Sequence, residues 1–257
     1  MNILITNDDG IHADGIRQLS TALKELGNIF IIAPDTERSA CGHSITLHQP
    51  LRIKKENISK NIKAWSITGT PSDCVKIAIE NILPQKPDLI VSGINNDANL
   101  GTDVIYSGTV SAAVEGALYD IPSLAISIYK KSEEIIYEGA LFYSCKLVEY
   151  VINNKLNTPP ILNINIPSLS KEDIQGIKIT ELGIRKYNNE YIMRKDPMGQ
   201  SYYWLSGSII DIKNSIESDV SAVETDFISV TPLQYNLTNY ELINTLKDKK
   251  LSEICIR

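Results

Sequence analysis

The sequence predicts an α/β protein built on a mostly parallel sheet, with a less regular C-terminal extension. Two observations lead to this fold class. Short apolar runs without polar alternation, typical of strands buried on both faces, recur through roughly the first 180 residues. Between them lie segments whose apolar residues recur every three or four positions, as in amphipathic helices. Strands and helices that alternate in this way form right-handed crossovers and a parallel sheet.

The predicted strands are apolar runs closed by a polar, glycine or proline breaker. They are expected at residues 3–6, 29–33, 64–68, 88–92, 123–127, 161–166 and 226–230. The run at 161–166 alternates with period two, which indicates two differently covered faces. A polar stretch at 35–49 separates the second and third runs, and a connection of that length in a compact domain tends to be functional.

The helices are predicted from apolar spacing and from residues typical of helix ends. The first is expected over 16–26, where apolar residues are spaced by 3, 4 and 3, and Gly27 follows in the usual place after a helix. Ser72 is a predicted N-cap for the second helix, which Pro84 would end. The segment Ser107-Gly-Thr109 opens a third helix rich in small residues.

The pattern changes after about Leu182. A long amphipathic helix is expected over 133–153, whereas residues 187–203 are polar and tyrosine-rich with weak periodicity. The last 20 residues suggest a short helix. We therefore expect one domain, divided into a core at 1–182 and a C-terminal extension at 183–257.

Composition and charge exclude several classes of protein. With 25 Lys and Arg against 31 Asp and Glu, the formal net charge is −6, and no basic stripe suited to a nucleic-acid polymer is present. The four cysteines form no CxxC pair. No signal peptide or membrane-length apolar run is visible, so a cytoplasmic location with no membrane partner is expected. The absence of GxSxG, GxxxxGK[ST] and GxGxxG disfavours serine hydrolases, P-loop NTPases and NAD-dependent dehydrogenases.

Oxygen-bearing side chains follow three of the predicted strands. Asp8 and Asp9 follow the first strand, Ser39 lies in the loop after the second, and Asn95 follows the strand at 88–92. Ligands of open parallel sheets bind where such strand ends converge. Carboxylate, hydroxyl and amide oxygens suit Mg²⁺, Mn²⁺ or Ca²⁺ better than zinc or copper. Each motif alone also fits a simple turn, cap or loop, and their shared placement favours a metal site.

A phosphate group would find further partners nearby. Gly108 and Thr109 could offer a backbone N–H and a hydroxyl, although simple N-capping by Ser107 or Thr109 explains these residues equally well. Asn99, in the loop after Asn95, and His43, in the long polar loop, are further candidate substrate contacts, with a solvated histidine as the plainer alternative for His43.

Taken together, these motifs resemble the SurE family of stationary-phase survival nucleotidases. The resemblance covers nearly the whole chain in family order, at residues 2–11, 33–39, 42–46, 69–73, 92–95, 99–101, 106–109 and 229–233. It implies a phosphatase that acts on nucleoside 5′- and 3′-monophosphates, with short polyphosphate as a further substrate of some members. It also implies a three-layer α/β/α Rossmann-like core, and a C-terminal extension exchanged or packed between subunits of a homodimer or homotetramer.

The resemblance also implies a ligand set. One divalent ion per subunit, Mg²⁺ or Mn²⁺, would be held by the residues matching Asp8, Asp9, Ser39 and Asn95, and the segment 107–109 would line the phosphate site. We expect the ion to neutralise charge on the phosphate and to orient an attacking water. Asp9 is the more favoured proton acceptor of the two aspartates.

One departure from the family pattern and two alternatives remain open at this stage. The family usually has glycine where this chain has Asp97, so we expect a strained backbone if φ is positive there, and an added negative charge near the phosphate. One alternative mechanism makes Asp8 a nucleophile that forms an aspartyl phosphate. Another class of function is a nucleotide sensor without turnover.

Overall fold

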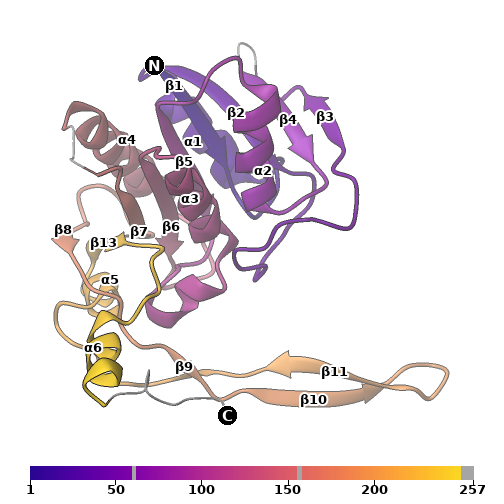
Figure 1. The fold of residues 1–257 in the computed structure, drawn as a ribbon, viewed down its shortest axis with the longest axis vertical. Helices are drawn as coiled ribbons and strands as arrows, with labels where there is room; N and C mark the ends of the chain where they lie inside the picture. The colour runs from indigo at the N-terminus through magenta and orange to yellow at the C-terminus, as the bar shows by residue number, and fades with distance from the viewer. Residues whose placement is uncertain (60–61, 155–157, 250–257) are drawn as a thin grey trace.

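The computed structural model describes residues 1–59, 62–154 and 158–249, and its centre is one nine-stranded sheet. The sheet order is β3-β4-β2-β1-β5-β6-β7-β13-β8 (Figure 1). Its strands are β1 (Asn2–Thr6), β2 (Asn28–Pro34), β3 (Ile53–Glu56), β4 (Lys63–Ile67), β5 (Leu89–Asn95), β6 (Ser123–Tyr129), β7 (Ile161–Pro167), β8 (Gly176–Ile179) and β13 (Phe227–Leu233). All seven predicted strands are present. The two edge strands, β3 and β8, escaped prediction, and the sequence of β3 is mostly charged.

Strand order reverses beside β1, and this places the site. The six strands from β4 to β7 run parallel, and β1 lies between β2 and β5. From β1 the chain builds the sheet outward through β2 and β4, and it then returns to the other side of β1 through β5. Open α/β sheets bind ligands at such a switch point, beyond the carboxyl ends of the strands.

Helices cover both faces of the sheet, which confirms the three-layer α/β/α prediction. The helical segments are α1 (Asp14–Leu23), α2 (Pro71–Ile77), a π-helical turn η1 (Ala78–Ile82), a 3₁₀ turn η2 (Gly101–Ile105), α3 (Gly108–Leu118), α4 (Tyr137–Asn153), α5 (Asp219–Glu224) and α6 (Tyr240–Asp248). Helices α1 and α4 cover one face of the sheet, in a core cluster that includes Ile3 and Ile5 of β1. Helices α2 and α3 pack with the opposite face, around Leu4.

Three predicted helix ends were wrong. The first helix ends at Leu23, and a turn follows in which the Leu26 N–H donates to the Leu23 carbonyl. Gly27 is not the cap: a Cβ there would lie 2.7 Å from the Met1 carbonyl oxygen, so close packing requires the glycine. The long helix begins at Tyr137, four residues later than expected.

The cap of α2 is Thr70 and not Ser72. The Thr70 hydroxyl accepts from the Asp73 N–H at 3.1 Å, and the Asp73 carboxylate accepts from the Thr70 N–H at 2.9 Å. This reciprocal capping box starts the helix two residues earlier than predicted, with Pro71 at the first helical position, where its missing N–H costs nothing.

The extension is more regular than its sequence suggested. β13 returns to the sheet, antiparallel to β7. The tyrosine-rich segment forms an antiparallel hairpin, β10 (Glu190–Lys195) and β11 (Ser201–Ser206), that projects from the body as an arm (Figure 1). Short strands β9 (Lys186–Tyr187) and β12 (Ile209–Ile210) form its base. The predicted C-terminal helix is present as α6, and the division of the chain near Leu182 stays a prediction.

The described helices include none with the length and apolar character needed to cross a bilayer.

Candidate active site

Asp8 is held at the carboxyl end of β1 by the first turn of α3. Its carboxylate accepts the Thr109 hydroxyl at 2.6 Å and the Thr109 N–H at 3.1 Å. A Cβ at Gly108 would lie 2.8 Å from the Asp8 Cβ, so only glycine lets the helix approach this closely. The sequence predicted Thr109 as a phosphate contact, and in the structure both of its donors hold Asp8.

The two aspartates are destabilised as anions. Burial raises the pKa of Asp8, against the opposing effect of the Thr109 hydrogen bonds. Burial and the neighbouring charges of Asp8, Glu37 and Asp97 raise the pKa of Asp9 to about 7. Two carboxylates in such a setting need positive charge or further donors to stay ionised together.

Buried polar atoms without partners gather at the same strand ends. Thr6 Oγ1, Asn7 Oδ1, Asp9 Oδ2 and Ser92 Oγ are buried and find no hydrogen-bond partner within the described ranges. Thr6 and Ser92 are register partners on β1 and β5, and Asn7 and Asp9 lie in the segment that directly follows β1. Buried polar groups are almost always satisfied, so this cluster marks the position of a bound ligand or water.

The loop after β5 completes one wall of the site. The Asn96 main chain acts to lower the pKa of Asp9, against the larger effects that raise it. The Asn95 amide NH₂ donates to the Asp97 carbonyl at 2.5 Å, and the amide oxygen, which has no hydrogen bond within the described residues, could act as a ligand. Tyr137, at the start of α4, donates to the Asn96 amide oxygen at 2.6 Å and anchors this loop.

The loop that carries Ser39 is attached to the site by the neighbouring residue, Arg38. The Arg38 N–H donates to the Asp8 carbonyl at 2.7 Å, which fastens the long loop to the end of β1. The exposed Ser39 hydroxyl donates to the Glu37 carboxylate at 2.6 Å. Glu37 is an acidic neighbour of both aspartates that the sequence reasoning did not single out.

These residues fit a hard divalent cation. The predicted ligands offer two carboxylates, a hydroxyl and an amide oxygen, which suit Mg²⁺ or Mn²⁺. Asp9 Oδ2 has no partner among the described residues and burial raises the pKa of both aspartates, and a positive charge beside them would offset both effects. Among the described residues, no three His, Cys, Asp or Glu side chains form a metal cluster by themselves. The fit therefore depends on Ser39 and Asn95 joining the two aspartates.

The remaining predicted substrate contacts already have partners in the protein. Ser107 caps α3, because its hydroxyl accepts the Val110 N–H at 3.0 Å. His43 Nε2 lies 2.8 Å from the buried Glu115 carboxylate on α3. Asn99 is buried, and its side-chain NH₂ donates to the Ser127 hydroxyl at 2.8 Å.

Asp97 does not have the strained backbone expected for it. It is absent from the described non-glycine residues with positive φ, so aspartate fits this position without strain. Its carboxylate lies on the exposed side of the loop and forms an ion pair with Lys130 at 2.8 Å. Its charge contributes to the raised pKa of Asp9, and the expected effect on a bound phosphate stays a prediction.

Fold and site together define a doubly wound α/β protein with oxygen-bearing side chains at its topological switch point. The family model described as "Survival protein SurE" matches residues 3–189. The protein named 5′-nucleotidase SurE of Alkaliphilus metalliredigens is 47% identical over 98% of this chain and 100% of its own length. Its namesake in Heliobacterium modesticaldum is also 47% identical, over 96% and 91%.

A solved structure of a family member also matches this chain. The crystal structure of SurE from Aquifex aeolicus superposes with a TM-score of 0.83 at 39% identity, and the match covers 97% of this chain and 100% of that chain. The chain belongs to the SurE family. The resemblance drawn from the sequence and the Rossmann-like fold class are both confirmed.

Proposed function

We propose that this chain is a metal-dependent phosphatase that hydrolyses nucleoside 5′- and 3′-monophosphates to nucleoside and phosphate, with short polyphosphate as a further substrate. The observation that carries this proposal is the pair Asp8 and Asp9 at the switch point, with an unpartnered buried oxygen on Asp9. The enzyme class, a 5′-nucleotidase and phosphoric monoester hydrolase, is the one that the names of its relatives carry. One divalent ion per subunit, Mg²⁺ or Mn²⁺, is part of the proposal.

Asp8, Asp9, Ser39 and Asn95 are the proposed ligands. A bound divalent cation supplies positive charge that offsets the charge on the phosphate and lowers the pKa of a water molecule. Thr109 keeps the Asp8 carboxylate in one orientation through two hydrogen bonds. The hydrogen bond from Asn95 to the Asp97 carbonyl fixes which way the amide oxygen faces.

Asp9 is the proposed proton acceptor. Its buried Oδ2 has no hydrogen-bond partner among the described residues, so it could accept a proton from an attacking water. Attack on phosphorus breaks the bond to the nucleoside oxygen, and that oxygen takes up a proton. The first turn of α3 aims its N–H end at the site, where it would favour a phosphate oxygen. Substrate contacts by Asn99, Ser107, Gly108 and His43 stay predictions.

The arm is the proposed subunit contact of a homodimer or homotetramer. Its strands bury little, and Tyr203, Trp204 and Leu205 are each at least 60% exposed. An isolated hairpin is at best marginally stable, and an exposed apolar surface of this kind marks an interface. A cytoplasmic location is also proposed, supported by the free thiols of Cys41, Cys74 and Cys145, while Cys255 lies outside the described residues.

The proposal is tested by phosphate release from AMP and GMP with Mn²⁺ or Mg²⁺. Asp8→Asn and Asp9→Asn should each lose at least about 100-fold in rate, because either change removes a charged ligand. Asp120→Asn, which alters an exposed carboxylate after α3 at a positive φ that asparagine tolerates, should keep full activity. Binding of AMP without turnover would instead support a sensor, and a phosphoaspartate trapped by rapid quench would make Asp8 a nucleophile.

A further inference from the structure

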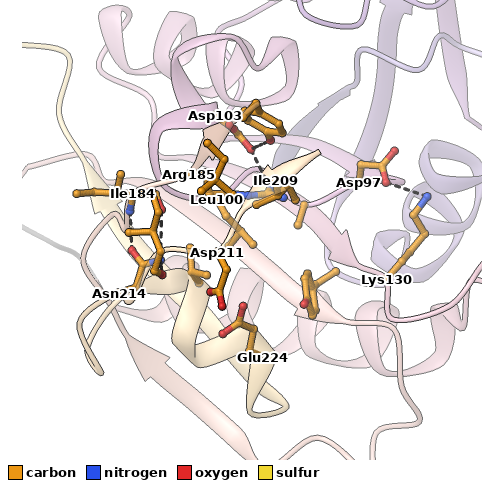
Figure 2. Close-up of a pocket in the computed structure, with 16 residues that line it drawn as sticks. Asp97, Leu100, Asp103, Lys130, Ile184, Arg185, Ile209, Asp211, Asn214 and Glu224 are labelled. Carbon is orange, nitrogen blue, oxygen red and sulfur yellow. Dashed lines mark hydrogen bonds and ion pairs between the residues drawn. The ribbon is translucent and has the colours of Figure 1, made fainter. Parts of the chain in front are cut away.

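A cavity of about 470 Å³ lies beside the loop that carries the proposed ligand Asn95. Asp97 and Ala98 of that loop form one side of the cavity, and the base of the arm forms the opposite side (Figure 2). Its volume lies within the usual range for small-molecule sites. None of the proposed ligands lines it, so this cavity is separate from the ion-binding cluster and adjacent to it.

The walls of the cavity are fixed before any ligand arrives. Buried Asp219 accepts the N–H groups of Gly101 and Gly183, both at 2.8 Å, and so ties the segment after the site loop to the start of the extension. Arg185 forms an ion pair with Asp103 at 2.8 Å, and Tyr187 donates to the same carboxylate at 2.6 Å. A preorganised pocket loses little conformational freedom on binding.

The lining is apolar and aromatic with a negative balance of charge. Its apolar and aromatic members include Leu100, Tyr129, Ile184, Tyr187, Ile209 and Ile210. The charged members are four carboxylates and two cations. Both cations, Lys130 and Arg185, are already paired with carboxylates. A phosphate chain is therefore disfavoured here, and a flat neutral ring with N–H donors is favoured.

Two carboxylates in this cavity face each other. Figure 2 shows Asp211, from the arm base, and Glu224, at the end of α5, pointing toward one another. Within the part of the chain that the structure describes, no hydrogen bond or ion pair engages either carboxylate. Guanine presents adjacent N–H donors at N1 and N2, which match carboxylate acceptors, whereas adenine and cytosine each present a single amino group on that edge.

We propose that this cavity binds the base of the substrate nucleotide, and that Asp211 and Glu224 favour guanine. The inference rests on the proposed nucleotidase function, because it assigns the base of that substrate. Asp97 joins the two regions, since its carbonyl accepts the amide NH₂ of the proposed ligand Asn95 and its residue lines the cavity. A nucleotide with its phosphate at the ion-binding cluster would extend its base into the cavity.

The test compares ligands with and without a base and a phosphate. Guanosine binding to the full-length protein is measured by calorimetry, and kcat/KM is measured for GMP, AMP and ribose 5-phosphate. The double variant Asp211→Asn with Glu224→Gln should weaken guanosine binding about tenfold or more, because hydrogen bonds to charged acceptors are lost. The ratio of kcat/KM for GMP to that for ribose 5-phosphate should fall by a similar factor. Glu172→Gln, an exposed carboxylate outside the cavity, should change neither quantity.

A second variant keeps the inference falsifiable if the double variant folds poorly. Ile210→Trp fills the cavity from the half-exposed arm base and should weaken guanosine binding without altering the carboxylates. Unchanged guanosine binding in both variants, or no binding by the wild-type protein, would overturn the inference. So would a bound Mn²⁺ that disappears in the double variant, because it would make the two carboxylates a cation site. Failure of the proposed function is distinct: no phosphomonoester would be hydrolysed, while guanosine would still bind.

Discussion

Thr109→Val tests how the site holds its first carboxylate. Valine has nearly the same size as threonine but lacks the hydroxyl that donates to Asp8 at 2.6 Å. The backbone bond at 3.1 Å would remain. A hydrogen bond to a charged group contributes about 1.5–3 kcal/mol, and the loss of a residue that orients a metal ligand typically costs 10–100-fold in metal affinity. We therefore expect Mn²⁺ affinity to fall by about 10–100-fold.

Calorimetric titration with Mn²⁺ measures this loss directly, and phosphate release at saturating Mn²⁺ shows whether catalysis recovers. Thr109→Ser keeps the hydroxyl and should stay close to the wild-type affinity. Thr225→Val makes the same chemical change at a hydroxyl that bonds only main-chain carbonyls of α5, and should leave Mn²⁺ binding intact. Wild-type affinity in Thr109→Val would refute the idea that Thr109 positions Asp8.

Five further predictions follow from the same geometry. Gly108→Ala should lower the rate of phosphate release about 100-fold with an unchanged circular dichroism spectrum, since the new Cβ displaces Asp8. Burial and nearby carboxylates raise the pKa of Asp9 to about 7, so Mn²⁺ must displace a proton from Asp9 below that pH. Calorimetry should therefore show Mn²⁺ affinity rising with pH to about 7 and then levelling. The folded chain holds this proton more tightly than the unfolded chain, so the melting temperature of the metal-free protein should fall as pH rises from about 4 to about 7. Asp97→Gly removes an 80% exposed carboxylate, so urea titrations should show a change in unfolding free energy of less than about 0.5 kcal/mol. The KM for AMP should fall, because the repulsion between the Asp97 carboxylate and the phosphate is removed. Trp204→Glu puts a charge on the exposed arm, and analytical ultracentrifugation should show smaller assemblies than the wild type forms.

The fold of the first half was predictable because its signals are local. Buried parallel strands produce uninterrupted apolar runs, and every such run appears as a strand of the sheet. The helix ends were harder to predict, because neighbouring residues compete for the cap position. Thr70 and Ser72 are both reasonable caps by residue type, and the reciprocal bonds with Asp73 decided between them.

The extension was harder to predict because its structure depends on distant partners. β13 finds its place between β7 and β8, and neither partner lies near it in sequence. Both strands of the arm, β10 and β11, are exposed along their whole length. Because neither strand has a buried face, the sequence carries no hydrophobic pattern from which the strands could be predicted. Tertiary pairing, and not local propensity, determines these elements.

The site was predictable as a set of residues but not as a network. Strand ends pointed to Asp8, Asp9 and Asn95, whereas nothing local marked Glu115 as the partner of His43. Glu115 lies 72 positions from His43, within a helix whose other residues are mostly small and apolar. The one available signal was Glu115 itself, a lone glutamate on the buried face of such a helix. A buried carboxylate requires a partner.

Crystals soaked in Mn²⁺ and measured at the manganese absorption edge test the central proposal most directly. The proposal predicts one anomalous peak per chain, within bonding distance of oxygens from Asp8, Asp9, Ser39 and Asn95. A peak bound by other residues, or no peak where these side chains meet, would contradict it.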